Sequence, residues 1–260
     1  MSFRAKIKEL VLRTFALVRQ DRSGKVVFYH DVFDRQRYTG MGTPLSMFEK
    51  HIATARTSGW KIVDGLPSQD KELMVCFDDG FHGLYDCRYD LRAMSLHPTV
   101  FIAIDLIGKD GYLTWDEIRE LQDEYGFIFE SHTWSHQTLV GRYIKDSPIA
   151  ERTEEWFKHE LEDSRIEIGK RLGKDVTALC FPAGCFSDEI VARCVMAGYK
   201  TLFASYPGRI HDNHTAGGLE GAMIIPRHLV QHSSEKEFSA VLYGALLPFR
   251  GKYLKQHRVT

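Results

Sequence analysis

Residues 73–80 read Leu-Met-Val-Cys-Phe-Asp-Asp-Gly, an apolar run that ends in two adjacent carboxylates and a glycine. The first five residues are typical of a buried β-strand, and the glycine permits a sharp turn directly after it. Two neighbouring ionised carboxylates at the end of a buried strand are unfavourable in free energy unless a cation compensates their charge. The segment therefore indicates a strand that delivers Asp78 and Asp79 to a site, although an Asp-Asp-Gly turn at the surface would explain the same residues.

Short apolar runs alternate with helical segments along the rest of the chain. Strands that alternate with helices pair in parallel and are covered by those helices, so the pattern predicts an α/β fold, and seven or more repeats favour a barrel. In barrels of this kind, reactive side chains lie at the carboxyl ends of the strands. The predicted strands are 26–29, 73–77, 99–104, 127–129, 178–181, 201–204 and 223–225; the predicted helices include 46–58, 85–94, 114–124, 149–172 and 188–197.

Composition limits the kind of protein. The chain has 260 residues, of which 43% are hydrophobic, enough for one domain of barrel size. Lys plus Arg number 34 against 35 Asp plus Glu, so the near-zero net charge gives no general attraction to nucleic acid, and we expect no nucleic-acid partner. The five cysteines are scattered without a CxxC pair, which is typical of reduced thiols and not of a disulfide framework.

The first 22 residues are interpreted as an N-terminal amphipathic helix that precedes one domain, residues 23–260. Charged residues interrupt any apolar core of a signal peptide, and no stretch suits a transmembrane span, so we expect a cytoplasmic protein. The favoured interpretation packs the helix on its own domain, and the alternative lays it on a membrane surface. Its apolar positions include Phe3, Ile7, Leu10 and Leu17, and its basic positions are Arg4, Lys6, Lys8, Arg13 and Arg19.

Residues 129–136, Phe-Glu-Ser-His-Thr-Trp-Ser-His, form the second segment with chemical character. His132 and His136 are four residues apart, a spacing that would put both imidazoles on one face of a helical turn, within reach of one metal ion. The pair alone is a weak signal, because two hydrogen-bonded histidines explain it equally well. It is not the HExxH motif of metalloproteases, since Thr133 occupies the position of that motif's glutamate.

Together the two segments indicate a metal-dependent hydrolase. Two histidines and one carboxylate hold a metal and leave positions open for water and substrate. A second carboxylate beside them can take a proton from that water. Asp79 as ligand and Asp78 as general base is the natural assignment, but the spacing does not decide which Asp has which role.

These residues resemble the motifs of the polysaccharide deacetylases, the carbohydrate esterase family 4 that shares the NodB homology domain. The family's TFDDG motif is matched by residues 76–80 and its HTxxH motif by residues 132–136, in the expected order, and the similarity covers most of the chain. The resemblance implies a distorted (β/α)7-type barrel, a catalytic domain in residues 23–260, and metal-dependent hydrolysis of the N-acetyl group of an amino sugar. It also implies that Asp78 is the base and that Asp79, His132 and His136 bind the metal.

The third motif departs from the usual family form, which begins with arginine. Residues 180–184, Cys-Phe-Pro-Ala-Gly, resemble the FxYPxG variant of the branch that deacetylates poly-N-acetylglucosamine. In that branch the missing arginine has to come from elsewhere to orient the base. Arg227 is the candidate, and an ordinary surface arginine is the alternative. The residues assigned to substrate binding are Phe181, Pro182, Gly184 and Trp134, of which Phe181 and Trp134 would form apolar walls for the sugar ring.

The motifs leave the general acid open, because nothing near the C-terminus matches the family's Leu-x-His cleanly. Residues 26–31, Val-Val-Phe-Tyr-His-Asp, resemble the YHxV segment of the circularly rearranged branch, where the histidine is the acid. We therefore prefer His30. His228 and His232 are the alternatives, and a structural histidine is the simpler explanation of each.

Zinc is the expected metal, and Co²⁺, Ni²⁺ and Mn²⁺ suit the same ligands. The expected partner is an N-acetylated amino sugar in a surface glycan or its precursor, with peripheral membrane contact through the N-terminal helix. Two other functions compete with this interpretation. One is a deformylase or amidohydrolase that acts on another amide, and the other is a catalytically inactive carbohydrate-binding protein of the same fold.

Overall fold

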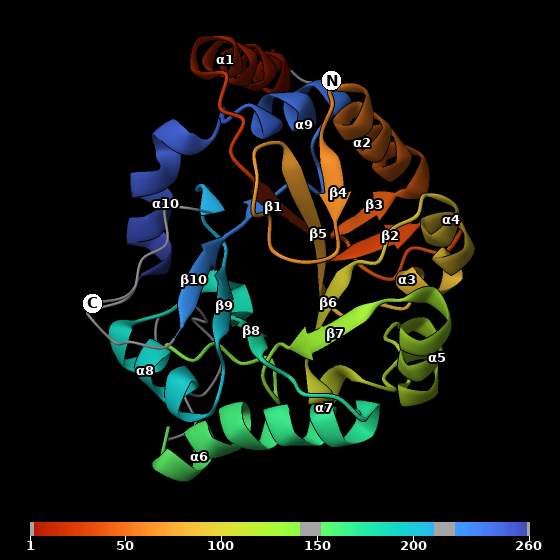
Figure 1. Ribbon diagram of the computed structural model, residues 1–260, viewed down its shortest axis with the longest axis vertical. Helices are drawn as coiled ribbons and strands as arrows, with labels where there is room; N and C mark the ends of the chain where they lie inside the picture. Colours follow the sequence, from red (N-terminus) through yellow and green to blue (C-terminus); the bar gives the residue numbers. More distant parts are fainter. Residues whose placement is uncertain (1–2, 141–151, 211–221, 259–260) are drawn as a thin grey trace.

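A parallel sheet forms the centre of the molecule (Figure 1), and the computed structural model describes it through residues 3–140, 152–210 and 222–258. Nine strands make the sheet in the order β10-β9-β8-β7-β6-β5-β1-β11, with β4 paired to β5 beside this path, and β2 and β3 form a separate pair. The strands are β1 (Lys25–Tyr29), β2 (Asp31–Phe33), β3 (Gly42–Pro44), β4 (Lys61–Val63), β5 (Glu72–Asp79), β6 (Thr99–Ile102), β7 (Ile128–Ser131), β8 (Ala178–Cys180), β9 (Thr201–Ala204), β10 (Met223–Pro226) and β11 (His228–Leu229).

Helices surround the sheet in Figure 1. Thr114 begins α5 with a capping box, accepting from the backbone N–H of Glu117 while the Glu117 side chain accepts from the N–H of Thr114. Ser234 begins α9 in the same way. The helices are α1 (Phe3–Arg19), α2 (Leu45–Thr57), α3 (Gly83–Asp86), α4 (Arg88–Ala93), α5 (Trp115–Tyr125), α6 (Glu154–Lys158), α7 (Ser164–Leu172), α8 (Asp188–Met196), α9 (Glu235–Leu242) and α10 (Arg250–His257), together with a π-helical turn, η2 (His159–Asp163), and a 3-10 turn, η6 (Leu247–Phe249).

A single bent strand brings the two edges of the sheet together. β10 pairs with β9 and β11 pairs with β1, yet only Arg227 separates β10 from β11. We call each strand position in the barrel wall a stave. The two short strands together form one stave, and the other six are β1, β5, β6, β7, β8 and β9, so the barrel has seven staves. The predicted α/β barrel of the (β/α)7 type is therefore confirmed, as a nearly closed barrel.

All seven predicted strands lie in these staves. They could be recognised from the sequence because a strand that is buried on both faces is apolar along its whole length. Side chains alternate between two cores. Val75 and Phe77 face the helices, in the larger cluster, while Met74 and Cys76 join Phe101 in the smaller cluster inside the barrel. Three of the five predicted helices formed within one or two residues of their expected ends, as α2, α5 and α8. The segment 85–94 is divided between α3 and α4, and the segment 149–172 forms α6, η2 and α7 from Glu154 onward, with positions 149–151 outside the described residues.

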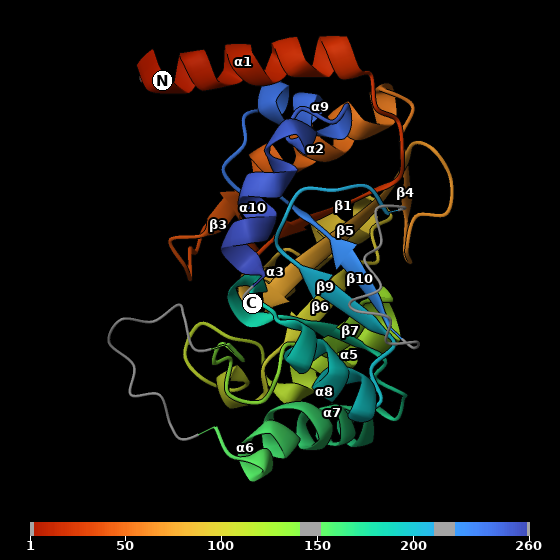
Figure 2. The same ribbon diagram turned by 90° about the vertical axis from the view of Figure 1, so that its left-hand side faces the viewer.

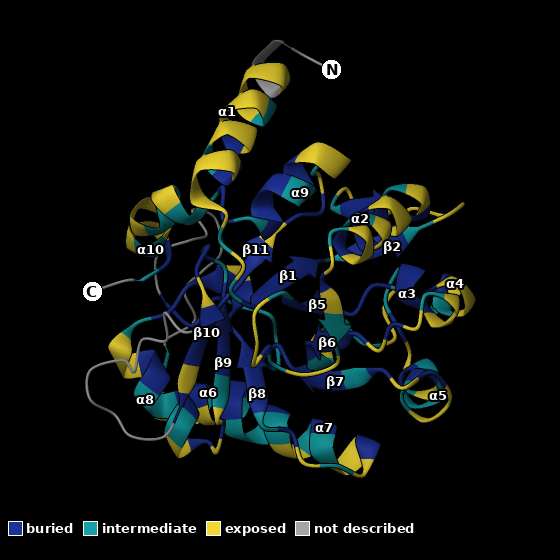
Figure 3. Ribbon diagram, turned by 45° about the horizontal axis from the view of Figure 1, so that its top comes forward, coloured by how far each residue is buried: buried dark blue, intermediate teal, exposed yellow. Residues whose placement is uncertain are grey.

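The N-terminal helix α1 lies across one end of the molecule, above α9 (Figure 2). Leu12 and Ala16 are buried against Ala240 and Ala245 in a small separate core. Much of the rest of α1 is exposed (Figure 3), and its exposed apolar side chains are Ile7, Leu10, Val11, Leu17 and Val18. No helix in the described part of the chain is long and apolar enough to cross a membrane.

Candidate active site

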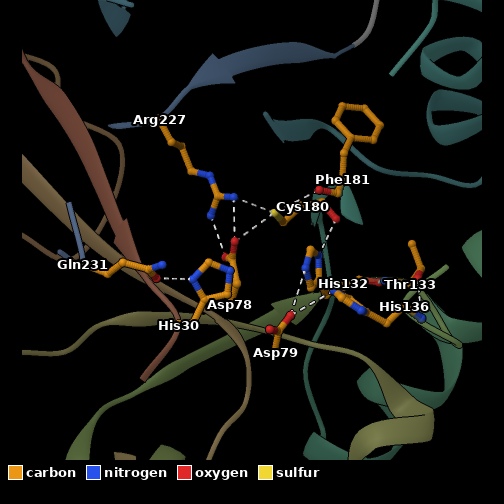
Figure 4. A network of polar contacts seen from close by, with 11 residues as sticks. His30, Asp78, Asp79, His132, Thr133, His136, Cys180, Phe181, Arg227 and Gln231 are labelled. Carbon is orange, nitrogen blue, oxygen red and sulfur yellow. Dashed lines mark hydrogen bonds and ion pairs between the residues drawn. The ribbon is translucent and has the colours of Figure 1, made fainter. Parts of the chain in front are cut away.

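The residues predicted to bind the metal and to catalyse the reaction meet at the carboxyl ends of the barrel strands (Figure 4). Asp78 and Asp79 end β5, His132 follows β7, and Arg227 follows β10. They border one cavity of about 610 Å³. Its lining includes His30, Asp78, Asp79, His132, His136, Gly184 and Arg227. The barrel thus brings together residues that are distant in sequence, as expected for this architecture.

The alternation of side chains along β5 separates the two aspartates. Asp78 continues the series of Met74 and Cys76, whose side chains point into the barrel. The same alternation would turn Asp79 toward the helices with Val75 and Phe77, but its left-handed backbone, φ 71°, departs from the strand conformation, and Asp79 lines the cavity as well. The two carboxylates therefore meet different neighbours.

Arg227 holds the Asp78 carboxylate with both arms of its guanidinium. Nη1 donates to Oδ1 at 2.6 Å and Nη2 donates to Oδ2 at 2.8 Å. Burial would raise the pKa of Asp78, but the charge and hydrogen bonds of Arg227 outweigh it and bring this pKa below its ordinary value. Asp78 is therefore an ionised carboxylate in a buried place, which suits a general base.

Arg227 is itself 1% exposed and has partners on several sides. Its guanidinium lies 4.1 Å from the ring centroid of Phe28, and Nη2 also donates to the Cys180 sulfur at 2.8 Å. Burial raises the pKa of the Cys180 thiol well above its usual value, so this cysteine remains protonated and is not a nucleophile.

Asp79, His132 and His136 form a cluster that fits a divalent metal. Asp79 Oδ1 lies 3.0 Å from His136 Nε2 and 3.4 Å from His132 Nε2. This oxygen is buried and accepts no well-aligned hydrogen bond from the residues described. The His132 Nδ1 proton goes to the Cys180 carbonyl oxygen at 2.7 Å, so a neutral His132 presents the lone pair of Nε2 to Asp79. Three converging lone pairs suit a metal such as zinc.

A second possible set of ligand atoms lies nearby, in Asp78, His132 and Cys180. It suits a metal less well, because Arg227 occupies both oxygens of Asp78 and also donates to the Cys180 sulfur. A metal there would have to displace the guanidinium or lie beside its positive charge. The geometry therefore favours the set of Asp79, His132 and His136.

The two histidines lie in a loop, so the prediction that they would lie on a helical turn was wrong. Thr133 and His136 have left-handed backbones, with φ values of 71° and 62°, which no regular helix contains. Side-chain oxygens replace the missing helical hydrogen bonds. Ser131 Oγ accepts from the Thr133 N–H, and Thr133 Oγ1 accepts from the His136 N–H. Local polar bonds thus outweigh the helical spacing of residues 132–136.

Glu160 holds the same loop in place from outside, a role that no sequence pattern indicates. Its side chain is 1% exposed and accepts from the backbone N–H groups of Trp134 and Ser135, at 3.1 and 2.9 Å, and from Ser135 Oγ at 2.6 Å. Glu160 lies in the π-helical turn η2. Such turns are rare and are often found at functional sites, but no residue pattern marks this one.

His30 lies at the rim of the cavity, between exposed and buried. Its Nδ1 donates to the Gln231 Oε1 at 2.5 Å, which orients the ring and leaves Nε2 for proton exchange. The alternative His228 is buried and bonded to the Gly208 carbonyl at 3.0 Å, and burial lowers its pKa to about 4. His228 is therefore neutral at ordinary pH, while His232 is exposed on the same cavity.

Of the four residues assigned to substrate binding, Gly184 lines the cavity and three others do not. Phe181 is fully buried and stacks on Phe186 at 5.4 Å, and Pro182 is buried beside it. Trp134 lies against the ring of His159, with its indole N–H donated to Asp105. The apolar wall expected from Phe181 and Trp134 is not found around the cavity, because both rings pack against protein neighbours. Gly184 has φ 66° and lies so close to Ser205 that a Cβ at this position would come within 2.3 Å of the Ser205 Cβ.

Comparison with known proteins agrees with this geometry. The family model for polysaccharide deacetylase matches residues 65–202, more than half of the chain. The chain therefore belongs to the polysaccharide deacetylase family, whose members are hydrolases that remove acetyl groups from carbohydrates. YxkH of Bacillus subtilis (strain 168), named for the same family, is 23% identical over 208 residues, 75% of this chain and 70% of that protein.

Solved structures share the fold. The polysaccharide deacetylase BC0361 from Bacillus cereus superposes with a TM-score of 0.68 at 19% identity, over 85% of this chain and 69% of that one. IcaB from Ammonifex degensii gives 0.67 at 17% identity, over 86% and 99% of the two chains. At these identities the likeness concerns the barrel, and the roles of individual residues depend on the geometry described above.

Proposed function

We propose that this protein removes the N-acetyl group of an amino sugar in a surface glycan or its precursor, with a divalent metal held by Asp79, His132 and His136. The observation that carries the proposal is the buried Asp78–Arg227 pair beside these three ligands. An ionised base next to a cluster that fits a metal is an arrangement that can catalyse amide hydrolysis. Binding of a sugar does not by itself need a carboxylate held ionised in a buried place, because taking such a charge out of water is costly.

The residues divide the chemistry between them. A bound divalent cation supplies Lewis acidity and lowers the pKa of a bound water, and zinc is favoured over Co²⁺, Ni²⁺ and Mn²⁺. Asp78 accepts the proton of the attacking water, and Arg227 keeps Asp78 ionised until then. His30 donates a proton to the departing nitrogen, because an amine anion is too basic to leave unaided. Water and amide thus become acetate and a free amino sugar.

We further propose that the enzyme works at the cytoplasmic surface of a membrane. Ile7, Leu10, Val11, Leu17 and Val18 follow one another at helical spacing on the side of α1 that faces away from α9. Lysine and arginine residues border this apolar stripe, as in helices that lie in the interface of anionic lipid. A membrane location would suit an enzyme that modifies glycan precursors.

The decisive experiment compares acetate release by wild type and by Asp78→Asn. Zinc-loaded protein would be given N-acetylglucosamine oligomers, an N-acetylated sugar phosphate and the N-formyl analogue of each. We expect kcat/KM of the variant to fall by at least about a hundredfold, since general bases contribute about 10²–10⁴-fold. Zinc content should remain equal in both proteins, because Asp78 is paired with Arg227 and is not a ligand.

The outcomes separate the competing functions. Faster release of formate than of acetate would favour a deformylase. A zinc-loaded wild type that releases neither from any sugar would refute the hydrolase and support an inactive sugar-binding protein.

A further inference from the structure

The active-site cavity extends well beyond the residues assigned to catalysis, and its lining becomes more apolar with distance from them. From the metal ligands it continues past β11 to the ends of α9 and α10 and to the inner side of α1. Apolar side chains stand there beside Lys8, Gln256 and His257, in contrast to the charged groups around Asp78. The lining side chains there include Leu12, Val241, Leu246 and Tyr253.

A second hollow of about 350 Å³ continues the first one outward. It lies between α1, η6 and α10, and adds Val11, Phe249 and Lys252 to the lining. Five residues border both hollows, so the two hollows form one groove that leads from the active site to the surface. The shared residues are Lys8, Leu12, Leu246, Tyr253 and Gln256.

Positive charge accompanies this apolar groove. Lys8 and Lys252 border it from α1 and α10, and Lys8 is also paired with Glu237 at 3.0 Å while 63% of its side chain remains exposed. A groove with apolar walls and ammonium groups at its side matches a hydrocarbon chain that carries an anion.

The outer end of the groove meets the exposed apolar stripe of α1. Val11 belongs to both, because it lines the hollow and is also 41% exposed next to Leu10 and Ile7. A chain that leaves the groove at Val11 therefore arrives at an apolar surface and not in water. Continuity of this kind is expected where a ligand is drawn from a lipid layer into a site.

We propose that the substrate is a lipid-linked amino sugar, in which a phosphate joins the N-acetylated sugar to a long hydrocarbon chain. This inference rests on the proposed deacetylase function and names its substrate class. The sugar occupies the cavity beside the metal ligands, the hydrocarbon lies between α1 and α10, and the phosphate meets Lys8, which borders both hollows.

The first test measures how kcat/KM depends on the chain. N-acetylglucosamine 1-phosphate esterified with a methyl group is compared with its decyl ester, below the micelle concentration and without membranes. Each methylene that enters the groove contributes roughly fourfold, so we expect the decyl ester to be favoured by at least about a hundredfold. Val11→Asp should reduce this preference at least about tenfold. Ile166→Asp, which changes an apolar residue that is 50% exposed on α7, should leave it unchanged.

The second test does not depend on turnover. Calorimetry measures the binding of decyl phosphate and butyl phosphate to wild type, Val11→Asp and Ile166→Asp. Tight binding of decyl phosphate that Val11→Asp alone weakens, by about tenfold or more, is the expected result. Thermal melting shows that each variant is folded.

The possible results distinguish the two proposals. Acetate released equally well from methyl and decyl esters, or better from N-acetylglucosamine oligomers, would overturn the lipid-linked substrate and leave the deacetylase intact. Decyl phosphate that binds no more tightly than butyl phosphate would overturn it as well. Binding of decyl phosphate without hydrolysis of any amide would refute the deacetylase and, with it, the substrate assigned here.

Discussion

Arg227 reaches Asp78 from 149 residues further along the chain. Sequence patterns gave Asp78, Asp79, His132 and His136 as a group, because two motifs carry them. They could not assign the roles of the two aspartates, which depend on the alternation in β5 and the left-handed backbone of Asp79. For Arg227 the family pattern gave only a reason to look for an arginine, and its position depends on the closure of the barrel.

Arg227→Lys should lower kcat/KM for acetate release by at least about tenfold. Lysine keeps the positive charge but loses the second N–H, so one Asp78 oxygen would remain buried without its partner, at a cost of about 1–3 kcal/mol of unfolding free energy. Acetate assays and urea unfolding measure both effects.

The matched control is Arg193→Lys. Arg193 grips Glu154 with the same two-armed geometry, at 2.6 and 2.8 Å, but this pair is at the surface. The control should cost less than about 1 kcal/mol and leave kcat/KM unchanged. If Arg227→Lys were equally harmless, Arg227 would not be orienting the base.

The loop of His132 and His136 depends on a helix that supplies no ligand. The turn η2 widens the helix between α6 and α7 at the point where Glu160 accepts three hydrogen bonds from residues 134–135. The four-residue spacing of the two histidines suggested a regular helical turn instead. The actual loop is stabilised by contacts that are distant in sequence, which explains why the grouping of Asp79, His132 and His136 was predictable and the local conformation of the loop was not.

Glu160→Gln should weaken zinc binding by about 10–100-fold, as substitutions behind metal ligands commonly do. The amide places an N–H₂ group where the loop also offers N–H donors, so His136 would lose its fixed position. Competition with a zinc-binding dye measures the affinity. Glu155→Gln, at an exposed position of α6, is the control and should retain wild-type affinity. Equal affinities in both variants would refute the positioning role.

The contact of α2 with β1 predicts an acid-sensitive element. His51 accepts from Tyr29 OH at 2.9 Å through Nδ1 and donates to the Ser233 carbonyl at 3.0 Å through Nε2, an arrangement that requires the neutral ring. Burial lowers the pKa of His51 to about 4, below the unfolded value near 6.5. The unfolded state therefore binds more protons between these values, and stability falls as pH falls from about 6.5 to 4.

His51→Gln should reduce that pH dependence. The variant loses hydrogen-bond geometry and is less stable at pH 7.5, but one proton fewer is taken up on unfolding, so the slope decreases by up to about 1.4 kcal/mol per pH unit. Urea unfolding at pH 7.5, 6.0 and 5.0 tests this. Parallel curves for variant and wild type would show that His51 does not titrate as its contacts imply.

At the scale of the molecule, the seven staves were predictable and the small strands were not. Each stave is an apolar run that is buried by helices on one side and by the barrel on the other. In contrast, β2, β3 and β4 have three residues each, like β8, but each of them contains a polar residue or glycine and proline, whereas β8 belongs to a buried apolar run. Strands of this kind depend on the neighbours with which they pair, and no periodicity develops over so few residues.

The outward stripe of α1 predicts binding to anionic phospholipid vesicles. Replacing both Leu17 and Val18 by Glu should reduce binding by at least about a hundredfold, since each large apolar side chain contributes about 1.5–3 kcal/mol on burial. Co-sedimentation with vesicles at low and high salt measures it. Met196→Glu changes a residue that is 87% exposed on α8 and should have no effect. Wild type that stays in the supernatant with every vesicle would refute the membrane proposal.

The stave of β10 and β11 also sets the order in which the enzyme becomes competent during synthesis. A ribosome finishes Asp78, Asp79, His132 and His136 well before it reaches Arg227. Until residues 223–229 dock between β9 and β1, the nascent chain has Asp79, His132 and His136 but lacks the strand that closes the barrel, and Asp78 lacks its arginine partner. Closure of the barrel and pairing of Asp78 depend on the same segment, so we expect a chain that ends before Arg227 to be inactive without any inhibitor.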